Sequence, residues 1–519
     1  MKRHDIHRRL RLGVSGWVRL ALMTAFLAAL WVSVPNTVYD PANRRIIFAM
    51  GILGLWRYAW WFTHYVRSQV YARRVFPRIR RDCEALWQSG WRPKRVLYMA
   101  TTFREVPATT EALLASIIRE IHDTGIPARV FFGTAEASDE KVITEYVEAH
   151  AKDVDLHLTF VRQNLPGKRI AIGLALRSMC RQGVDEDDIC VFLDGDTYME
   201  PGLLRKCLPV FQVRPNTTAL TTDERAVVNG PQWMQWWTDM RMAQRQLAMQ
   251  SVALSGKVLT LTGRCSIFRA KEVVEEKFIR TIEADYLDHW LWGRFRFLSG
   301  DDKSSVYALF CKPEGVTLRY IPDAVAVTTE YVEGGGLTRV RQNLLRWSGN
   351  MLRNGRRCID LGPRRLGFFT WWCFIDQRLA MWTTLAGPLL ALYMATLSGL
   401  SVLWAAAVTV LTTRFLLSLL LYQFSGRVYL SFVWLLYFNQ IVNASVKVYM
   451  TFRLAKQRWR NRGDQKSADG LGWLARYQNF MGVYMTKAAV AGFAYLLFAA
   501  FVFRGFPAVP VVRHTFGLR

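Results

Sequence analysis

The sequence contains no closely paired cysteines. Its eight cysteines are scattered between residues 83 and 373 without a C-x-x-C pair. A disulfide framework and a zinc site are therefore not expected, and a reducing cytoplasmic face is the simpler interpretation. Acidic residues are scarce, because 41 Asp and Glu stand against 68 Lys and Arg and the formal net charge is +27. This balance suits nucleic acid, anionic lipid or a polyanionic substrate, but no zinc-finger or RNA-binding signature accompanies it, so no nucleic acid partner is expected.

Two nucleotide-binding fingerprints are also missing. Neither G-x-G-x-x-G nor G-x-x-x-x-G-K-[ST] follows a predicted strand, which argues against a dinucleotide or P-loop site. Apolar residues, by contrast, are abundant: the chain is 51% hydrophobic, with 20 Trp and 30 Phe. The aromatic and basic residues mostly flank apolar runs, a pattern typical of helices that meet lipid.

An apolar run from about Trp17 to Val34 is followed by a second from Ile46 to Phe62. We expect residues 1–65 to form a transmembrane hairpin, with basic flanks that place both ends in the cytoplasm. Arg57 interrupts the second run, so it must either snorkel or face protein.

Four more runs of membrane-spanning length follow, at about 378–397, 402–421, 428–450 and 484–504. They predict a polytopic membrane protein. Its expected parts after the catalytic region are channel helices in 366–452, a basic cytoplasmic loop in 453–483, and a last helix and tail in 484–519. The charge rule needs an even number of crossings before the basic loop, whereas three runs precede it. One run is therefore re-entrant or interfacial, or the boundaries merge or split a helix.

Between these apolar regions, strands alternate with helices. The predicted strands are Arg95–Thr102, Ala128–Gly133, Leu156–Val161 and one ending at Leu193, and the helices are Thr109–Asp123 and Ile170–Gln182. This βαβ series predicts a parallel sheet with helices on its faces, in a cytoplasmic domain over residues 66–365 that includes interfacial helices. Nucleotides bind such sheets outside the carboxyl ends of the strands.

One such strand end carries two carboxylates. Val191 to Leu193 reads as a buried strand, and Asp194, Gly195 and Asp196 follow it directly. Carboxylates at this edge suit a hard divalent cation, which binds one or two of them together with substrate phosphates. A solvated Asp-Gly turn is the alternative interpretation.

Asp301 and Asp302 stand next to each other where a loop meets a helix. Because paired carboxylates repel, we expect the pKa of one of them to be raised toward that of a general base. The alternative is a helix N-cap supported by the helix dipole.

Two further motifs fit the same chemistry. Gln342, Arg346 and Trp347 form Q-x-x-R-W, whose spacing places them on neighbouring positions of one helical face. Arginine can neutralise a diphosphate and tryptophan can stack on a sugar ring, although an amphipathic helix at the membrane surface would show the same pattern. Thr262, Gly263 and Arg264 form a turn that could let an acceptor approach the backbone.

In this order before a membrane block, D-x-D, G-D-D and Q-x-x-R-W resemble the processive family-2 glycosyltransferases. The stretches VFLDGDTYMEPGLLRK, FLSGDDKSS, RWSGNMLRN and YFNQIVNASVKVYMTFRL are most similar to the alginate-polymerising branch of that family. The resemblance covers about residues 15–460. It implies an α/β GT-A (Rossmann-like) cytoplasmic domain inserted between transmembrane helices.

The resemblance also implies roles for individual residues. Asp194 would contact the nucleotide diphosphate and Asp196 the metal, Mg²⁺ or Mn²⁺. Asp302 would be the base that deprotonates the acceptor, supported by Asp301. The family usually grips uridine with an Asp after the second strand; here Glu136 is the candidate, a change compatible with guanine. The other residues expected to bind donor or acceptor are Thr102, Lys168, Arg264, Lys303, Gln342, Arg346, Trp347, Trp459 and Arg462.

The implied activity is inverting polymerisation of GDP-mannuronate into β-1,4-linked polymannuronate, with translocation across the bacterial inner membrane. Implied partners are inner-membrane lipids, the growing polysaccharide, a separate PilZ-type cyclic di-GMP-binding co-polymerase and periplasmic export proteins. A synthase of a neutral β-glucan from UDP-glucose is the alternative, although no PilZ-like C-terminal segment of the cellulose synthase kind is found. The apolar runs contain three cations, Arg378, Arg414 and Lys447. They favour a polyuronate product, whose carboxylates they could contact on the translocation path. The alternative is that they anchor the helices at the lipid headgroups.

Overall fold

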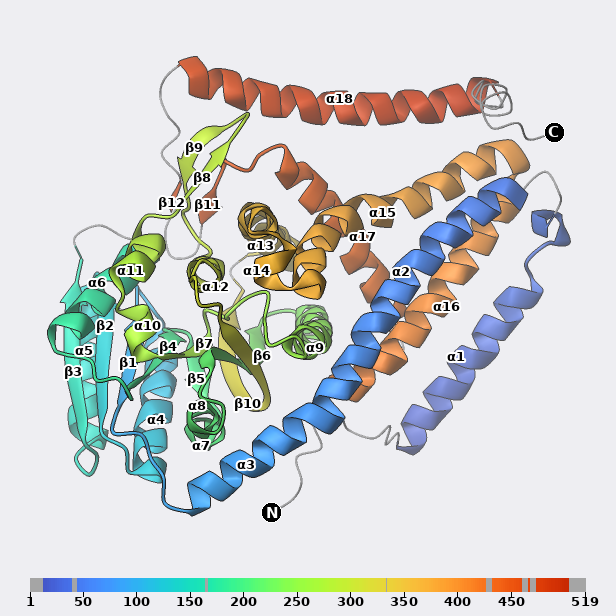
Figure 1. Cartoon of the computed structure of the whole chain (residues 1–519). Helices are drawn as coiled ribbons and strands as arrows, with labels where there is room; N and C mark the ends of the chain where they lie inside the picture. The colour runs from blue at the N-terminus through green and yellow to red at the C-terminus, as the bar shows by residue number, and fades with distance from the viewer. Residues whose placement is uncertain are drawn as a thin grey trace.

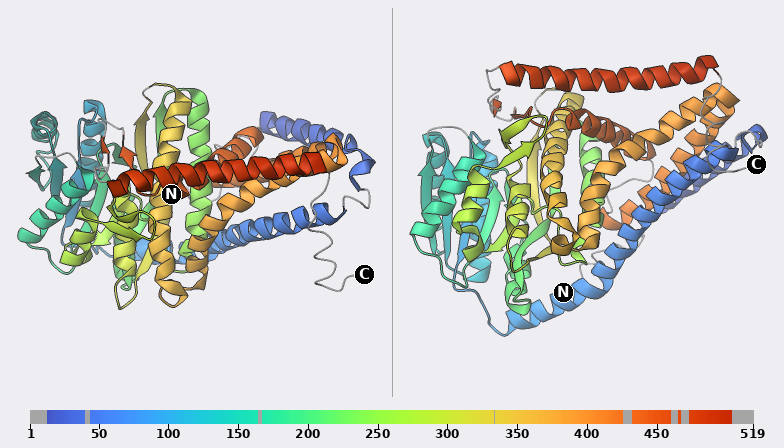
Figure 2. Two further views of the ribbon diagram at one scale, coloured as in Figure 1. Left: turned by 90° about the horizontal axis from the view of Figure 1, so that it is seen from above. Right: turned by 45° about the horizontal axis from the view of Figure 1, so that its top comes forward.

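A helix-covered β-sheet and a set of long apolar helices occupy opposite ends of the molecule (Figure 1). Helices α9 (Gln232–Ala253) and α13 (Gly336–Asp360) lie between these ends, and two further views show the same arrangement (Figure 2). The computed structural model describes residues 13–39, 44–163, 167–332, 334–425, 432–459, 465–466 and 473–503.

The large sheet has eight strands. In spatial order they are β3 (Leu156–Arg162), β2 (Ala128–Thr134), β1 (Val96–Thr101), β4 (Ile189–Asp194), β7 (Cys265–Arg269), β6 (Thr217–Asn229), β10 (Thr317–Tyr331) and β5 (Thr197–Met199). Strands β3, β2, β1 and β4 run parallel, as predicted.

The prediction of a wholly parallel sheet is wrong beyond β4. Strand β7 runs antiparallel to both β4 and β6, and β5 runs antiparallel to β10. The reason lies in the connection after α9, which returns the chain to the carboxyl edge of β4. There the Asp194 N–H donates to the Arg264 carbonyl at 3.3 Å, so β7 enters the sheet from that edge.

Local sequence accounts for the first half of the sheet. Strands β1 and β4 are almost entirely buried, as expected for apolar runs covered on both faces. The predicted helices correspond to α4 (Pro107–Thr124) and α6 (Lys168–Arg181). Helix α4 begins at a proline and ends before Gly125, whose φ of 65° is the left-handed conformation common after helices.

The remaining shorter helices are α3 (Phe76–Gln88), α5 (Ala137–His150), α7 (Leu203–Cys207), α8 (Pro209–Val213), α10 (Ala270–Val273), α11 (Glu276–Glu283), α12 (Asp301–Phe310) and α14 (Gly362–Leu366). Two small two-stranded sheets are formed by β8 (Tyr286–His289) with β9 (Gly293–Arg296) and by β11 (Arg458–Trp459) with β12 (Gln465–Lys466).

Three helices in the described part of the chain are long and apolar enough to cross a membrane, as in a membrane protein: α1 (Val14–Val32), α15 (Phe368–Ser398) and α16 (Leu400–Ser425). Three further helices expected to cross do not meet the combined measure of length and apolarity within the described residues: α2 (Arg44–Val70), α17 (Val433–Thr451) and α18 (Trp473–Phe503).

Arg57 of α2 faces protein, one of the two alternatives expected from the sequence. Its guanidinium pairs with the Asp376 carboxylate of α15 at 2.5 Å. A charge among apolar helices is costly unless it is paired. This contact therefore neutralises both residues and joins α2 to α15.

Candidate active site

The carboxyl ends of β2, β1 and β4 form the edge on which the site is built. Thr101, the last residue of β1, pairs with Gly133 of β2 on one side and with Asp194 of β4 on the other. The D-x-D turn therefore lies one strand away from the end of β1. Gly195 is needed in this turn, because a Cβ there would lie 2.5 Å from the Thr101 carbonyl oxygen.

Lys168 joins the two acidic motifs. Its ammonium, at the start of α6, lies 2.6 Å from Asp194 Oδ1 and 3.1 Å from Asp301 Oδ2. Gly263 approaches the same point, since a Cβ on it would lie 3.3 Å from Asp194 Oδ2 and 3.5 Å from Lys168 Nζ. Carboxylates from β4 and α12 thus meet around one cation, although they are more than a hundred positions apart in the sequence.

Burial controls the charge state of this cluster. It raises the pKa of Asp194 to about 7, an effect that Lys168 opposes and that Asp196 and Asp301 reinforce. For Lys168 burial acts in the other direction, but the two carboxylates outweigh it and keep its pKa above the ordinary value. Lys168 is therefore a fixed positive charge between the two motifs at neutral pH.

Asp302 contradicts one sequence expectation. Although burial acts to raise the pKa of Asp302, Lys303 and Thr260 outweigh it and lower that pKa below its usual value. The Lys303 ammonium lies 2.8 Å from Asp302 Oδ2, and the Thr260 hydroxyl donates to the same oxygen at 3.0 Å. The expected rise in pKa is wrong for Asp302, because both neighbours favour its ionised form. Asp302 is thus ionised at neutral pH.

Arg264 and Asp196 lie on the same edge. The Arg264 guanidinium pairs with Glu224 of β6 at 3.2 Å, and Asp194 and Asp196 both act to raise its pKa. The Asp196 carboxylate accepts from the Thr197 hydroxyl at 3.2 Å.

The Q-x-x-R-W residues lie on α13, and Arg346 is the one on which the carboxylates of this edge act. Burial lowers the pKa of Arg346, and the opposing charges that act on it include Asp196 and Asp194. Trp347 stacks on Trp237 of α9, with ring centroids 6.2 Å apart and planes 14° apart. Gln342 is half-buried one turn earlier. The helix therefore presents a cation toward the D-x-D turn and an indole beside it.

The ends of β1 and β2 hold Thr102 and Glu136. The buried Thr102 donates its N–H to the Gly133 carbonyl at 3.1 Å. Glu136 pairs with Arg104 at 2.8 Å, while the Arg104 N–H donates to Asp139 at 2.8 Å. Arg104 was not predicted. Its φ of 50° is uncommon for a residue other than glycine, and such strained positions cluster at functional sites.

Two expected residues cannot be placed at the site. The backbone of Trp459 forms β11, but its side chain is outside the described part of the structure. Arg462 lies outside the described residues altogether.

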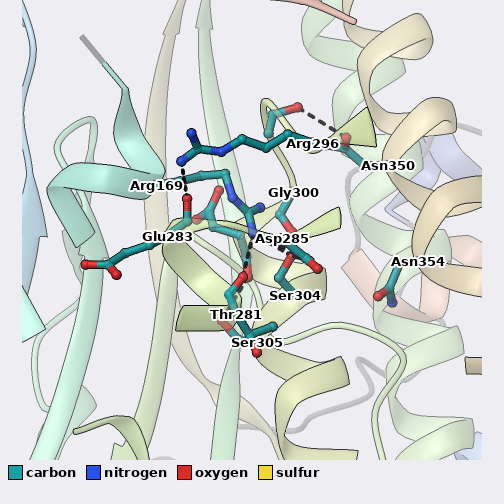
Figure 3. Close-up of polar contacts among 12 residues, drawn as sticks. Arg169, Thr281, Glu283, Asp285, Arg296, Gly300, Ser304, Ser305, Asn350 and Asn354 are labelled. Atoms are coloured by element: carbon teal, nitrogen blue, oxygen red, sulfur yellow. Dashed lines mark hydrogen bonds and ion pairs between the residues drawn. The ribbon is translucent and has the colours of Figure 1, made fainter. Parts of the chain in front are cut away.

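A buried ionic network braces the turn that carries Asp301 and Asp302 (Figure 3). Asp285 lies between Arg169, whose guanidinium is 3.5 Å away, and Arg357 of α13, with which it forms a closer ion pair. Ser304 donates to Asp285 and accepts from Arg169 at 3.0 Å. Arg169 directly follows Lys168, so this network fixes α6, α12 and α13 relative to one another. No local sequence pattern indicated this network.

The site fits a divalent cation held with the help of a substrate. In the described residues, no group of three or more His, Cys, Asp or Glu side chains could hold a metal. Mg²⁺ and Mn²⁺ sites in nucleotide enzymes, however, use one or two carboxylates and complete their shell with phosphates and water. Asp194 and Asp196 meet that requirement, because Asp196 acts electrostatically on Asp194 within one turn.

The mixed sheet, with acidic motifs at its carboxyl edge, is a GT-A glycosyltransferase fold. Residues 94–350 match the family described as Glycosyltransferase like family 2. The chain is 36% identical over 479 residues to "Glycosyltransferase alg8" of Pseudomonas syringae pv. tomato, covering 92% of this chain and 95% of the relative. It is 35% identical over 486 residues to "Glycosyltransferase alg8" of Azotobacter vinelandii, covering 93% and 97%.

The chain therefore belongs to the family-2 glycosyltransferases, in the group of the alg8 glycosyltransferases, and the predicted resemblance is confirmed. Among solved structures, the mannosyltransferase PcManGT from Pyrobaculum calidifontis, in complex with GDP-Man and Mn²⁺, is 17% identical. It covers 77% of this chain and 97% of its own, with a TM-score of 0.47.

Replacing Asp285 by Asn tests the bracing network. The change leaves Arg169 and Arg357 buried without their anion, which we expect to cost about 3–5 kcal/mol of stability and to reduce turnover by displacing the Asp301–Asp302 turn. Thermal unfolding of the purified protein and donor turnover measure the two effects. The control is Asp288→Asn on the same hairpin, where the side chain is 80% exposed and lies 3.8 Å from Arg294. Equal behaviour of the two variants would contradict the bracing role.

Proposed function

We propose that this glycosyltransferase polymerises GDP-mannuronate into β-1,4-linked polymannuronate, the alginate precursor, and passes the product across the bacterial inner membrane. The observation that carries the proposal is the pair of Lys168 contacts, which gather both acidic motifs at one point facing Arg346. The similarity to alg8 glycosyltransferases over nearly the whole chain supports the alginate assignment.

The proposed reaction is a single displacement at C1 of the sugar. The acceptor hydroxyl oxygen forms a bond to C1 while the bond from C1 to the diphosphate oxygen breaks on the opposite side, so the anomer inverts. Asp302 accepts the hydroxyl proton, and its ionised state at neutral pH suits that role. Asp301 supports Asp302 and keeps Lys168 in place. The leaving GDP carries the electron pair.

Cations offset the charge that develops on the diphosphate. Arg346, Arg264 and Lys168 are the protein groups proposed to face it, because Asp194 acts electrostatically on all three. Asp194 and Asp196 would hold a bound Mg²⁺ or Mn²⁺. When bound, the ion supplies Lewis-acid stabilisation of the leaving group.

The remaining expected residues divide between donor and acceptor. Glu136 and Thr102, at the ends of β2 and β1, are proposed to contact the nucleoside, and Trp459 and Arg462 to approach it from the basic loop. Gln342 and Trp347 are proposed to hold the acceptor end, and Lys303 to keep Asp302 ionised.

The cytoplasmic placement of residues 66–365 and the channel role of residues 366–452 belong to the same proposal. So do residues 1–65 as the hairpin, 453–483 as the basic loop, and 484–519 as the last helix and tail. A separate PilZ-type subunit that binds cyclic di-GMP and periplasmic export proteins are the proposed partners.

Donor choice tests the proposal directly. Membranes that contain the chain should release GDP and make polymer from labelled GDP-mannuronate, but not from GDP-mannose or UDP-glucose. Membranes with the Asp302→Asn variant are the control for other enzymes. Polymer from UDP-glucose alone would instead support the neutral-glucan alternative.

Asp196→Asn tests the metal site. A neutral amide is a poor ligand for a hard cation, so donor affinity should no longer increase when Mg²⁺ or Mn²⁺ is added. Titrating GDP into the purified variant with and without metal measures this. Asp123→Asn, at an exposed helix end, is the matched control. Metal-dependent donor binding equal to wild type in the Asp196 variant would exclude the role.

Asp302→Asn separates chemistry from binding. Loss of the base should lower polymer formation by about 10²–10⁴-fold, while GDP affinity stays close to the wild-type value. Single-turnover assays and GDP titration on the same preparation measure the two quantities. A variant that no longer binds GDP would identify Asp302 as a binding residue.

A further inference from the structure

Arg241 of α9 is a half-buried cation that lies beside two stacked tryptophan rings. Its guanidinium carbon lies 4.9 Å from the ring centroids of both Trp237 and Trp347. One of its nitrogens donates to Asn439 Oδ1 at 3.2 Å, and the Trp237 indole N–H donates to the same oxygen at 3.0 Å. Helices α9, α13 and α17 therefore meet at this arginine.

Arg241 differs from Arg245 and Arg264 in having no acidic ion-pair partner in the described part of the chain. The acid that acts on it from a distance, Glu330, is paired with Arg339 at 3.2 Å. Arg245, one turn along α9, lies 3.2 Å from Glu224, and Arg264 pairs with the same carboxylate at 3.2 Å. No carboxylate lies within ion-pair distance of Arg241 in the described part of the chain. Burial lowers the pKa of Arg241 to about 10, so the side chain keeps its charge at neutral pH. A charge that is partly removed from water in this way is costly unless an anion reaches it.

Lys447 of α17, on the side of the apolar helices, also lacks an acidic ion-pair partner. Within the described residues its ammonium makes no ion pair or hydrogen bond, and the charges acting on it include Arg241, Asp376 and Arg57. The acid among these, Asp376, is already paired with Arg57 at 2.5 Å. Arg241 and Lys447 are thus two neighbouring cations without a protein counter-ion.

The position of the pair connects the reaction centre with the membrane helices. On one side Trp347 directly follows Arg346, and Arg264 acts electrostatically on Arg241. On the other side Asn439 and Lys447 belong to α17. We call the set Arg241, Lys447, Trp237, Trp347 and Asn439 the cationic passage.

Of the three cations that the sequence placed in the apolar runs, only Lys447 belongs to this passage. Arg378 donates to the Leu352 carbonyl at 2.5 Å. Within the described residues no hydrogen bond or ion pair joins Arg414 to the passage.

We propose that the cationic passage binds the product chain through its carboxylates, with Arg241 and Lys447 as the counter-ions of sugar-acid residues that have just left the reaction centre. A guanidinium offers a carboxylate two parallel N–H donors, and aromatic faces beside it stack on pyranose rings. A neutral glucan would leave both cations unpaired. The choice of a uronate as ligand rests on the proposed function, whereas the missing anions are a property of the structure itself.

Binding of defined oligosaccharides to the purified full chain in lipid nanodiscs tests the inference. The probes are a β-1,4-linked mannuronate hexasaccharide and its carboxyl-reduced, neutral counterpart, titrated calorimetrically. Arg241→Gln should weaken the charged probe about 10- to 100-fold, as expected for loss of a charge-assisted contact, and leave the neutral probe unchanged. Arg241→Lys should retain part of the affinity, and the preference for the charged probe should decrease with salt in the wild type.

Control variants separate charge in general from this site. Arg225→Gln removes a surface cation paired with Glu200 at 2.7 Å and should bind both probes like the wild type. Thermal unfolding shows whether each variant folds. If Arg241→Gln does not fold, Lys447→Gln provides the same test, because its ammonium makes no hydrogen bond or ion pair within the described residues.

The outcomes distinguish this inference from the proposed function. If the wild type turns over GDP-mannuronate but the folded Arg241 and Lys447 variants bind both probes unchanged, the passage is overturned and the function stands. If the wild type uses UDP-glucose and prefers the neutral probe, both fail. Selective loss of the charged probe in the variants supports the passage.

Discussion

The ammonium of Lys168 between Asp194 and Asp301 is the contact on which the geometry of the site depends. The carboxylates of Asp194, Asp196 and Asp301 repel one another, and burial raises the pKa of Asp194. One cation offsets part of that repulsion and also fixes a distance, because it ties the end of β4 to the start of α12. Arg169, the next residue of α6, continues the connection through Asp285 to α13. Motifs distant in the sequence are thus held together by alternating charges.

Basic side chains are paired with carboxylates in some parts of the molecule and not in others. Around the sheet edge the basic side chains have acidic partners, as in the pairs Arg264–Glu224 and Lys303–Asp302. Toward the membrane helices Arg57 is also matched, by Asp376. Between these two regions lie Arg241 and Lys447. Neither of them has a carboxylate within ion-pair distance in the described part of the chain.

The features predictable from sequence were those encoded locally. The apolar runs of β1 and β4 marked two buried strands, and the D-x-D turn followed from Gly195 between two carboxylates. Strand β7 was missed because its direction depends on where the chain returns after α9, which no periodicity records. The expected rise in the pKa of Asp302 was wrong for a similar reason. Thr260, which stabilises the ionised form, lies 42 positions away.

The residues that sequence analysis overlooked share a physical character. Each of them acts through partners on another element. Arg104 contacts α5, Asp285 contacts α12 and α13, and Arg241 contacts α13 and α17. In the sequence, an arginine in a helix such as α9 looks like an ordinary solvated or interfacial charge. It becomes informative once the structure shows two indole rings on it and no carboxylate beside it.

Whether cations without acidic partners, such as Arg241 and Lys447, contribute to binding depends on the charge of the product. A protein that handled only neutral sugars would lose stability from two half-buried cations without ion-pair partners and gain nothing in binding, because hydroxyl groups offset only a small part of the cost of desolvating a charge. A polyanionic product offsets this cost, because the carboxylate of each sugar residue that arrives serves as a counter-ion. When that sugar moves on, the carboxylate of the next sugar replaces it. Binding must remain weak enough for the chain to advance, and two cations without protein acids beside them meet that condition better than one deep ion pair. The unmatched charge of Arg241 and Lys447 thus favours an acidic polysaccharide over a neutral glucan on physical grounds.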